Sequence, residues 1–69
     1  MKVYHASVID KATGLEMVAE DCSYNSACYY LERRGAEVIR TYTKGDLTKI
    51  FTTGRTFVYD EDRGLLLGE

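Results

Sequence analysis

The side chains that most often carry out catalysis are few in this chain, and their spacing matches no common catalytic arrangement. His5 is the only imidazole, and Cys22 and Cys28 are the only thiols. The sequence contains no serine-nucleophile turn, no metalloprotease helix motif and no phosphate-binding glycine loop. The acidic run Asp60–Asp62 has the residue types for acid–base catalysis, but consecutive carboxylates at a turn are typical of a solvated loop. The sequence therefore predicts a protein that is not an enzyme.

The same residues are too few for a metal site. Structural zinc sites need a full tetrahedral set of side-chain ligands, and two cysteines with one histidine fall short of that set. The six glycines are spread one per predicted turn and form no phosphate-binding cluster. We therefore expect no metal and no cofactor. We also expect Cys22 and Cys28 to be reduced thiols, with Cys28 a small core residue.

Charge is distributed unevenly along the chain. Residues 1–32 have a formal charge of −3, residues 33–55 of +4 and residues 56–69 of −3. The basic middle segment also contains Tyr42 and Phe51, and a basic surface with aromatic residues is typical of an interface with nucleic acid or an acidic protein. Cations on edge strands and turns also protect sheets from aggregation, so a solvated surface fits the same pattern. Because the acidic ends oppose binding to phosphate, we expect a protein partner.

Tyrosines close to arginines are a second signal of an interface. The chain has six tyrosines and no tryptophan. Tyr29 and Tyr30 are turned about 100° from each other on a helix, so one narrow buried face cannot take both. Such residues are enriched at protein interfaces, although phenol rings can also cover the ends of a small core. The predicted partner-binding residues are Arg33, Arg34, Arg40, Lys49, Arg55, Tyr29 and Tyr30.

The segment Ser23–Gly35 is the one predicted helix. Its apolar face, at helical spacing, consists of Tyr24, Ala27, Cys28 and Leu31. Ser23 is a suitable N-cap, and Gly35 can take the left-handed conformation that ends helices. A helix of this length is unstable alone in water, so it must pack on a sheet. We expect Ala27, Cys28 and Leu31 to be among the most buried residues.

The other segments are predicted to be strands and turns. The expected strands are Lys2–Ile9, Leu15–Ala19, Glu37–Thr43, Leu47–Thr53 and Thr56–Tyr59. The first two form a hairpin through the turn Asp10–Gly14, in which Gly14 takes a positive φ. Leu65–Leu67 forms either a short sixth strand or an apolar tail on the core. Side chains alternate between the two faces of a strand, but this alternation does not decide which face of the later strands meets the helix.

The order β-β-α-β-β-β predicts one α+β domain over residues 1–69, with a single helix packed on an antiparallel sheet. The chain has no apolar run long enough to span a membrane and no apolar signal-peptide core after Met1-Lys2. We therefore expect a cytoplasmic protein that does not bind membranes.

Three features carry a resemblance to known small proteins. They are the turn ending in Gly14, the helix that opens at Ser23 with Ala27 inside it, and the turn Asp60–Gly64. In this layout the chain resembles small proteins of phages and mobile elements, and it is similar in element order to anti-CRISPR proteins that block the Cascade surveillance complex. The resemblance covers the whole chain and lies in element order. It implies a stoichiometric inhibitor that occupies a nucleic-acid-binding surface or a subunit interface of its target.

The leading hypothesis is therefore a non-enzymatic binding module, a small phage or mobile-element inhibitor of a host protein or ribonucleoprotein complex. One alternative is a nucleic-acid-binding protein that uses the basic segment 33–55. The other is a homo-oligomeric accessory or structural protein whose tyrosine-rich surface forms a homodimer interface.

Overall fold

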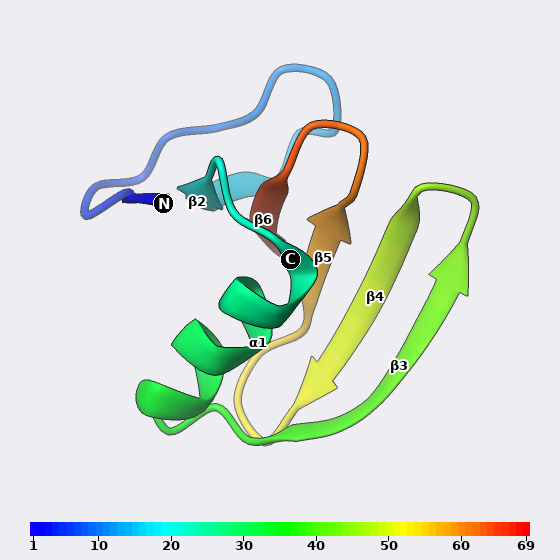
Figure 1. The fold of residues 1–69 in the computed structure, drawn as a ribbon. Helices are drawn as coiled ribbons and strands as arrows, with labels where there is room; N and C mark the ends of the chain where they lie inside the picture. The colour runs from blue at the N-terminus through cyan, green and yellow to red at the C-terminus, as the bar shows by residue number, and fades with distance from the viewer.

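A computed structural model describes residues 1–69 and has one helix packed against one antiparallel sheet (Figure 1). The elements, in chain order, are β1 (Lys2–Val3), β2 (Glu16–Glu20), α1 (Tyr24–Arg33), β3 (Val38–Lys44), β4 (Leu47–Thr52), β5 (Phe57–Asp60) and β6 (Leu65–Gly68). The six strands lie in the order β1-β2-β6-β5-β4-β3 across the sheet. The predicted α+β class, with a helix on an antiparallel sheet, is confirmed.

The C-terminal strand β6 lies inside the sheet, between β2 and β5. A strand that is covered on both faces has a sequence of consecutive apolar residues, and Leu65–Leu67 is such a run. Leu66 belongs to the core beneath α1, whereas Leu65 and Leu67 point to the opposite face; all three are buried. The prediction of a sixth strand is confirmed, and the alternative of an apolar tail is wrong.

α1 begins and ends where the sequence predicts. The Ser23 hydroxyl accepts a hydrogen bond from the backbone N–H of Ser26 at 3.1 Å, which satisfies a donor of the first turn. Gly35 follows the last turn with a φ of 81°, a conformation that strains other residues. Ala27 and Leu31 are buried against the sheet. α1 therefore buries one face and leaves the other exposed.

The core lies between α1 and the sheet. Its buried residues are Ala19, Cys22, Ala27, Leu31, Ile50, Phe57, Tyr59 and Leu66. The prediction that Cys28 is among the most buried residues is wrong, since Cys28 is only half-buried. The buried line of α1 runs through Ala27 and Leu31, and Cys28 is turned about 100° from Ala27. Cys22 is buried instead, and its thiol donates to the Gly64 carbonyl at 3.4 Å.

The face of β4 that meets α1 carries isoleucine and threonine. Ile50 is a core residue and Thr52 is also buried. Because successive strand residues point to opposite faces, Lys49 and Phe51 point away from α1. The structure thus shows which face of β4 meets the helix, which the alternation of side chains in the sequence leaves open.

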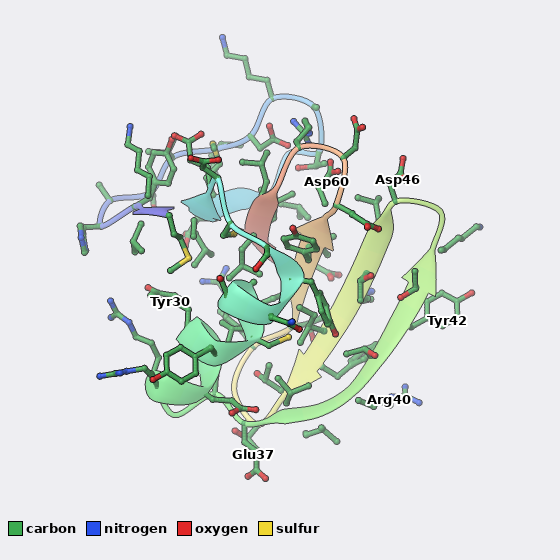
Figure 2. All side chains as sticks on the ribbon, viewed as in Figure 1. Tyr30, Glu37, Arg40, Tyr42, Asp46 and Asp60 are labelled. Atoms are coloured by element: carbon green, nitrogen blue, oxygen red, sulfur yellow. The ribbon has the colours of Figure 1, made fainter.

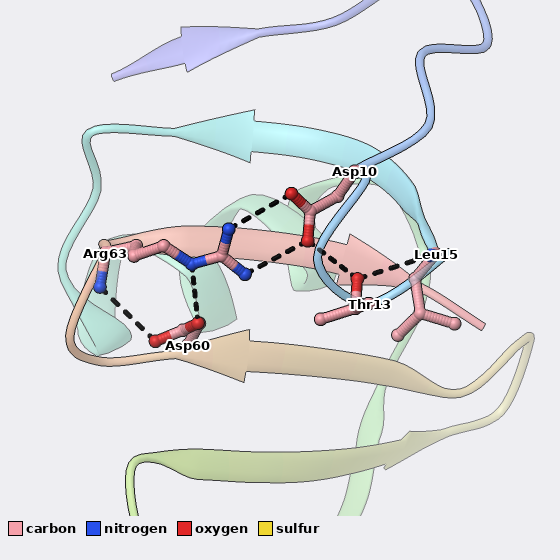
Figure 3. Close-up of polar contacts among 5 residues, drawn as sticks. All are labelled: Asp10, Thr13, Leu15, Asp60 and Arg63. Carbon is pink, nitrogen blue, oxygen red and sulfur yellow. Dashed lines mark hydrogen bonds and ion pairs between the residues drawn. The ribbon is translucent and has the colours of Figure 1, made fainter.

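The first strand is much shorter than predicted. β1 covers only Lys2–Val3, which pairs with the end of β2, and Ile9 makes one isolated bridge to Glu16. Residues 4–10 stay beside β2 without forming a regular ladder: the Tyr4 N–H donates to the Val18 carbonyl at 2.9 Å, and the Val8 carbonyl accepts from the Met17 N–H at 2.7 Å. The turn that follows Asp10 lies in front of β6 in Figure 3, where Asp10 is bound to Arg63. The predicted strand Lys2–Ile9 is therefore wrong beyond Val3, because its remaining bonds to β2 are too few for a strand. The predicted turn with Gly14 at positive φ is confirmed.

Arg63 holds this segment to the turn between β5 and β6 (Figure 3). Its guanidinium donates to both carboxylate oxygens of Asp10 at 3.0 Å and to Asp60 Oδ2 at 2.9 Å. These bonds from Arg63, followed by one from the Thr13 hydroxyl, lower the pKa of Asp10 to about 2. The expectation that Asp60 belongs to a solvated loop is therefore wrong: Asp60 is a buried residue of β5, whereas Glu61 and Asp62 are exposed.

The remaining strand boundaries differ from the predictions by at most one residue at each end. The only helix, α1, has ten residues, and no helix is long and apolar enough to cross a membrane.

Candidate protein-interaction surface

β3 and β4 form a hairpin at the side of the sheet that α1 leaves uncovered (Figure 1). Its turn is Gly45–Asp46, and the φ of 62° at Gly45 suits the first central position of a type II′ turn. Six of the seven residues of β3 are exposed, and only Val38 packs partly against the core. The hairpin therefore presents side chains to solvent along almost its whole length.

The side of this hairpin that points away from α1 alternates cations with apolar groups. Arg40 pairs with Phe51, Tyr42 with Lys49, and Lys44 with Leu47, so these cross-strand partners share one face. We call this surface the hairpin face. It consists of Arg40, Tyr42, Lys44, Leu47, Lys49 and Phe51.

The cations of the hairpin face differ in how they are held. The Arg40 guanidinium lies 4.7 Å from the Phe51 ring centroid, and Lys49 Nζ lies 5.8 Å from the same centroid. Lys49 is also 3.3 Å from the Glu69 carboxylate. Arg40 and Lys44 make no ion pair with any residue of the chain. Two unpaired positive charges thus flank the ring of Tyr42, which is 62% exposed.

A shallow groove adjoins this surface. It has a volume of about 450 Å³, and its lining includes Leu15, Tyr42, Leu47 and Val58. Lys49 and Glu69 also line the groove, so apolar groups and charges of both signs border it. The groove extends the hairpin face toward the middle of the sheet.

A second group of aromatic and basic residues lies on α1 and its C-terminal end. We call Tyr29, Tyr30, Arg33 and Arg34 the helix cluster. The Arg33 guanidinium lies 5.5 Å from the Tyr29 ring centroid and donates to the Tyr29 hydroxyl at 3.1 Å. The Arg34 guanidinium lies 4.9 Å from the Tyr30 ring centroid. Each arginine of the helix cluster is thus already engaged by a tyrosine of the same helix.

Arg55 connects β2 to the C-terminal residue of the chain. It donates to Glu16 Oε1 at 3.2 Å and to the backbone carbonyl of Glu69 at 3.3 Å, and it lies 5.5 Å from the Phe57 ring centroid. Arg55 and Arg34 line the same cavity, of about 350 Å³. Arg55 therefore lies on the helix side of the sheet and binds β2 to the C-terminus.

The sheet divides the predicted partner-binding residues between its two faces. Arg40 and Lys49 lie on the hairpin face, whereas Arg55 and the whole helix cluster lie on the side of α1. Figure 2 shows the separation, with Tyr30 beside α1 and Arg40 on the far side of β3. The structure does not bring these residues together as one site.

Four residues of the hairpin face are absent from the predicted set of partner-binding residues: Tyr42 and Lys44 of β3, and Leu47 and Phe51 of β4. The signal for the two residues of β3 is the spacing of Arg40, Tyr42 and Lys44 at every second position of one strand. Reading this spacing as a surface requires knowing that the strand lies at the edge of the sheet and that nothing covers the face opposite α1.

The residues considered for catalysis or metal binding lie apart. His5 is exposed in the segment between β1 and β2, and nowhere do three His, Cys, Asp or Glu side chains converge as ligands of a metal ion. Burial raises the pKa of the Cys22 thiol, and Asp10 and Asp60 both bind Arg63. The buried thiol and carboxylates therefore have partners within the fold.

Comparison of the chain with family models, curated protein sequences and solved structures finds no match.

Proposed function

We propose that this chain is a non-enzymatic binding module that holds a protein partner on its hairpin face. The observation that carries the proposal is the pair of unpaired cations, Arg40 and Lys44, on either side of the exposed ring of Tyr42. Aromatic and arginine side chains supply most hot spots of protein interfaces, and unpaired cations attract an acidic surface and orient it.

The helix cluster supports binding less well than the hairpin face. Arg33 donates to Tyr29 and Arg34 lies over Tyr30, so a partner must first compete with these contacts. On the hairpin face, Arg40 lies over the Phe51 ring in the same way, but Lys44 has no competing partner and Tyr42 has no cation over its ring. The hairpin face is therefore the better interface.

Nucleic acid fits the hairpin face less well than protein does. Proteins bind single strands through free aromatic rings on which bases stack. Arg40 and Lys49 already lie over the Phe51 ring, so Tyr42 is the one free ring of the hairpin face. The chain also has a net charge of −2, which opposes binding to phosphate.

The inhibitor role that the anti-CRISPR resemblance implies belongs to this proposal. A chain of 69 residues that covers a working surface of a larger host protein or ribonucleoprotein complex blocks that surface by occupancy. Inhibition would then require one copy of the chain per target site, and it would depend on the same residues as binding.

Affinity capture from a lysate of the host cell tests the proposal. The wild-type chain is immobilised beside the variant Arg40→Glu/Lys44→Glu, with and without nuclease. Lys44 is chosen over Lys49 because Lys49 is engaged by Glu69. Exposed substitutions usually change stability by less than about 0.5 kcal/mol, so the variant should fold.

We expect the wild type to retain a protein after nuclease treatment and the variant to lose it. Loss of all capture on nuclease treatment would favour the nucleic-acid alternative. Equal capture by the variant would place the interface on another surface.

A further inference from the structure

The outer edge of β3 is open. β3 is the last strand on one side of the sheet and has seven residues, whereas β1, at the opposite edge, has two. An edge strand carries unpaired backbone donors and acceptors that can pair with another chain. β3 is therefore the longest stretch of free strand edge in the molecule.

The register of the hairpin indicates which peptide groups point to this edge. Bonded and non-bonded pairs alternate along an antiparallel ladder, and the pair next to a two-residue turn is bonded. Counting from the pair of Lys44 with Leu47, the peptide groups of Tyr42 and Lys44 bond to β4. Those of Thr41 and Thr43 point outward. In agreement, the Thr43 and Thr48 hydroxyls, in a non-bonded pair, are 3.0 Å apart.

We propose that β3 takes up an extended, acidic segment of a protein partner as a further strand of the sheet. This inference rests on the proposed function and names the chemistry of its partner. The added strand bonds to the free peptide groups of Thr41 and Thr43. Its side chains on the hairpin face place carboxylates next to Arg40 and Lys44 and an apolar group next to Tyr42.

The charges favour an acidic segment over a second copy of the chain. Two β3 edges paired near their middles would gather the Arg40 and Lys44 side chains of both copies on one face, and like charges on neighbouring strands are destabilising. Cations on an edge strand oppose such self-pairing. The same cations attract carboxylates, so they select between the two occupants.

The probe is a synthetic peptide as long as β3, with the sequence Thr-Glu-Thr-Val-Thr-Glu-Thr, which places one glutamate for each unpaired cation. A second peptide with lysine in place of glutamate serves as its matched control. Binding is followed by NMR on the full chain, and hydrogen exchange is measured at the amides of Thr41 and Thr43. We expect the acidic peptide alone to bind and to slow exchange at both amides.

Reversal of the charges on the hairpin face provides the second arm of the experiment. The variant Arg40→Glu/Lys44→Glu should bind the acidic peptide about tenfold more weakly and should bind the lysine peptide in its place. The matched variant Arg33→Glu/Arg34→Glu alters the helix cluster by the same charge and should bind the acidic peptide as the wild type does.

A backbone variant provides the third arm. Thr41→Pro removes an amide that points away from β4, so the ladder to β4 stays complete. We expect this variant to keep dispersed NMR signals and to lose the acidic peptide. If it does not fold, the exchange rates and the charge-exchange variants still decide the question.

Four outcomes would overturn the inference. The first two are absence of peptide binding and binding without slower exchange at Thr41 and Thr43. The third is slower exchange at these amides with rising protein concentration alone, which indicates self-pairing. The fourth is preferential binding of an oligothymidylate over the peptide. Capture of a lysate protein that depends on Arg40 and Lys44, together with failure of the peptide arms, would leave the proposed function standing without strand addition.

Discussion

At the scale of the residue, what a charged side chain contributes depends on whether the fold supplies its counter-charge. Arg63 pairs with Asp10, and Arg55 pairs with Glu16, and both contacts hold together segments that are far apart in the chain. Arg63 also pairs with Asp60, three residues before it. Arg40 and Lys44 have no such counter-charge. A carboxylate of a partner can pair with them without first breaking an ion pair of the fold. Arg33 and Arg34 also have no counter-charge, but each is held against a tyrosine ring.

The Asp10–Arg63 contact makes stability depend on pH. The pKa of Asp10 lies at about 2 in the folded chain, below its ordinary value of 3.8, because Arg63 and then Thr13 stabilise the carboxylate. The ionised form therefore stabilises the fold above about pH 4, and this contribution is lost as the pH falls toward 2. Urea unfolding of wild type and Asp10→Asn should differ at pH 6 and converge near pH 2. A constant difference across this range would contradict the assignment, and Asp62→Asn, at an exposed site, is the control.

Leu31 should contribute strongly to the stability of the core. It is 2% exposed, and the loss of a buried leucine side chain typically costs about 2–5 kcal/mol. Leu31→Ala should therefore lower the free energy of unfolding in urea by an amount in this range. Tyr29→Ala, on the exposed side of α1, is the control and should change it by about 0.5 kcal/mol or less. Equal effects of the two substitutions would show that the buried face of α1 is wrongly assigned.

The two thiols should differ in reactivity. Cys22 is buried and its pKa is raised by burial, whereas Cys28 is half-buried. Because the thiolate is the reactive form, an alkylating reagent should modify Cys28 before Cys22 in the folded chain. In denaturant without reductant, intact mass should show two modified cysteines. No modification under denaturing conditions would indicate a disulfide and contradict the expectation of reduced thiols.

At the scale of the element, the sequence predicts local structure better than it predicts which strands pair over long distances. The helix follows from Ser23, Gly35 and a periodic apolar face, which are all local signals. The central place of β6 depends on its pairing with β2. In that pairing Met17 lies opposite Leu67, and the two strands are more than forty residues apart in the chain. The alternation of side chains along a strand does not specify that pairing. It also does not specify the irregular path of residues 4–10 beside β2 or the position of the next turn over β6.

Removal of β6 should therefore damage the fold more than removal of β1. A chain that stops after Gly64 loses the ladders to both β2 and β5, and it loses three buried leucines. A chain without residues 1–3 loses the short pairing of β1 with β2, the exposed ion pair of Lys2 with Glu20, and the partly buried Val3. We expect the first truncation to give a collapsed amide NMR spectrum and the second a dispersed one. A dispersed spectrum of the chain that ends at Gly64 would contradict the central role of β6.

At the scale of the whole molecule, the sheet separates groups that are neighbours in the sequence. Residues 33–55 carry a formal charge of +4, which from sequence alone predicts a single basic patch. The chain passes from α1 around the end of the sheet into β3, and the alternation of the strand then sends Arg40 and Lys44 to the face opposite the helix cluster. The candidate residues were therefore partly predictable from type and spacing, but their grouping was not, because it depends on which face α1 covers.

The most direct test of the central claim compares the two faces at equal net charge. Arg40→Gln/Lys44→Gln and Arg33→Gln/Arg34→Gln each remove two positive charges, one pair from the hairpin face and one from the helix cluster. The amount of partner captured from nuclease-treated lysate is measured for both variants and for the wild type. We expect the hairpin variant to lose the partner and the helix variant to retain it at the wild-type level. Loss in the helix variant with retention in the hairpin variant would contradict the claim and assign the interface to α1.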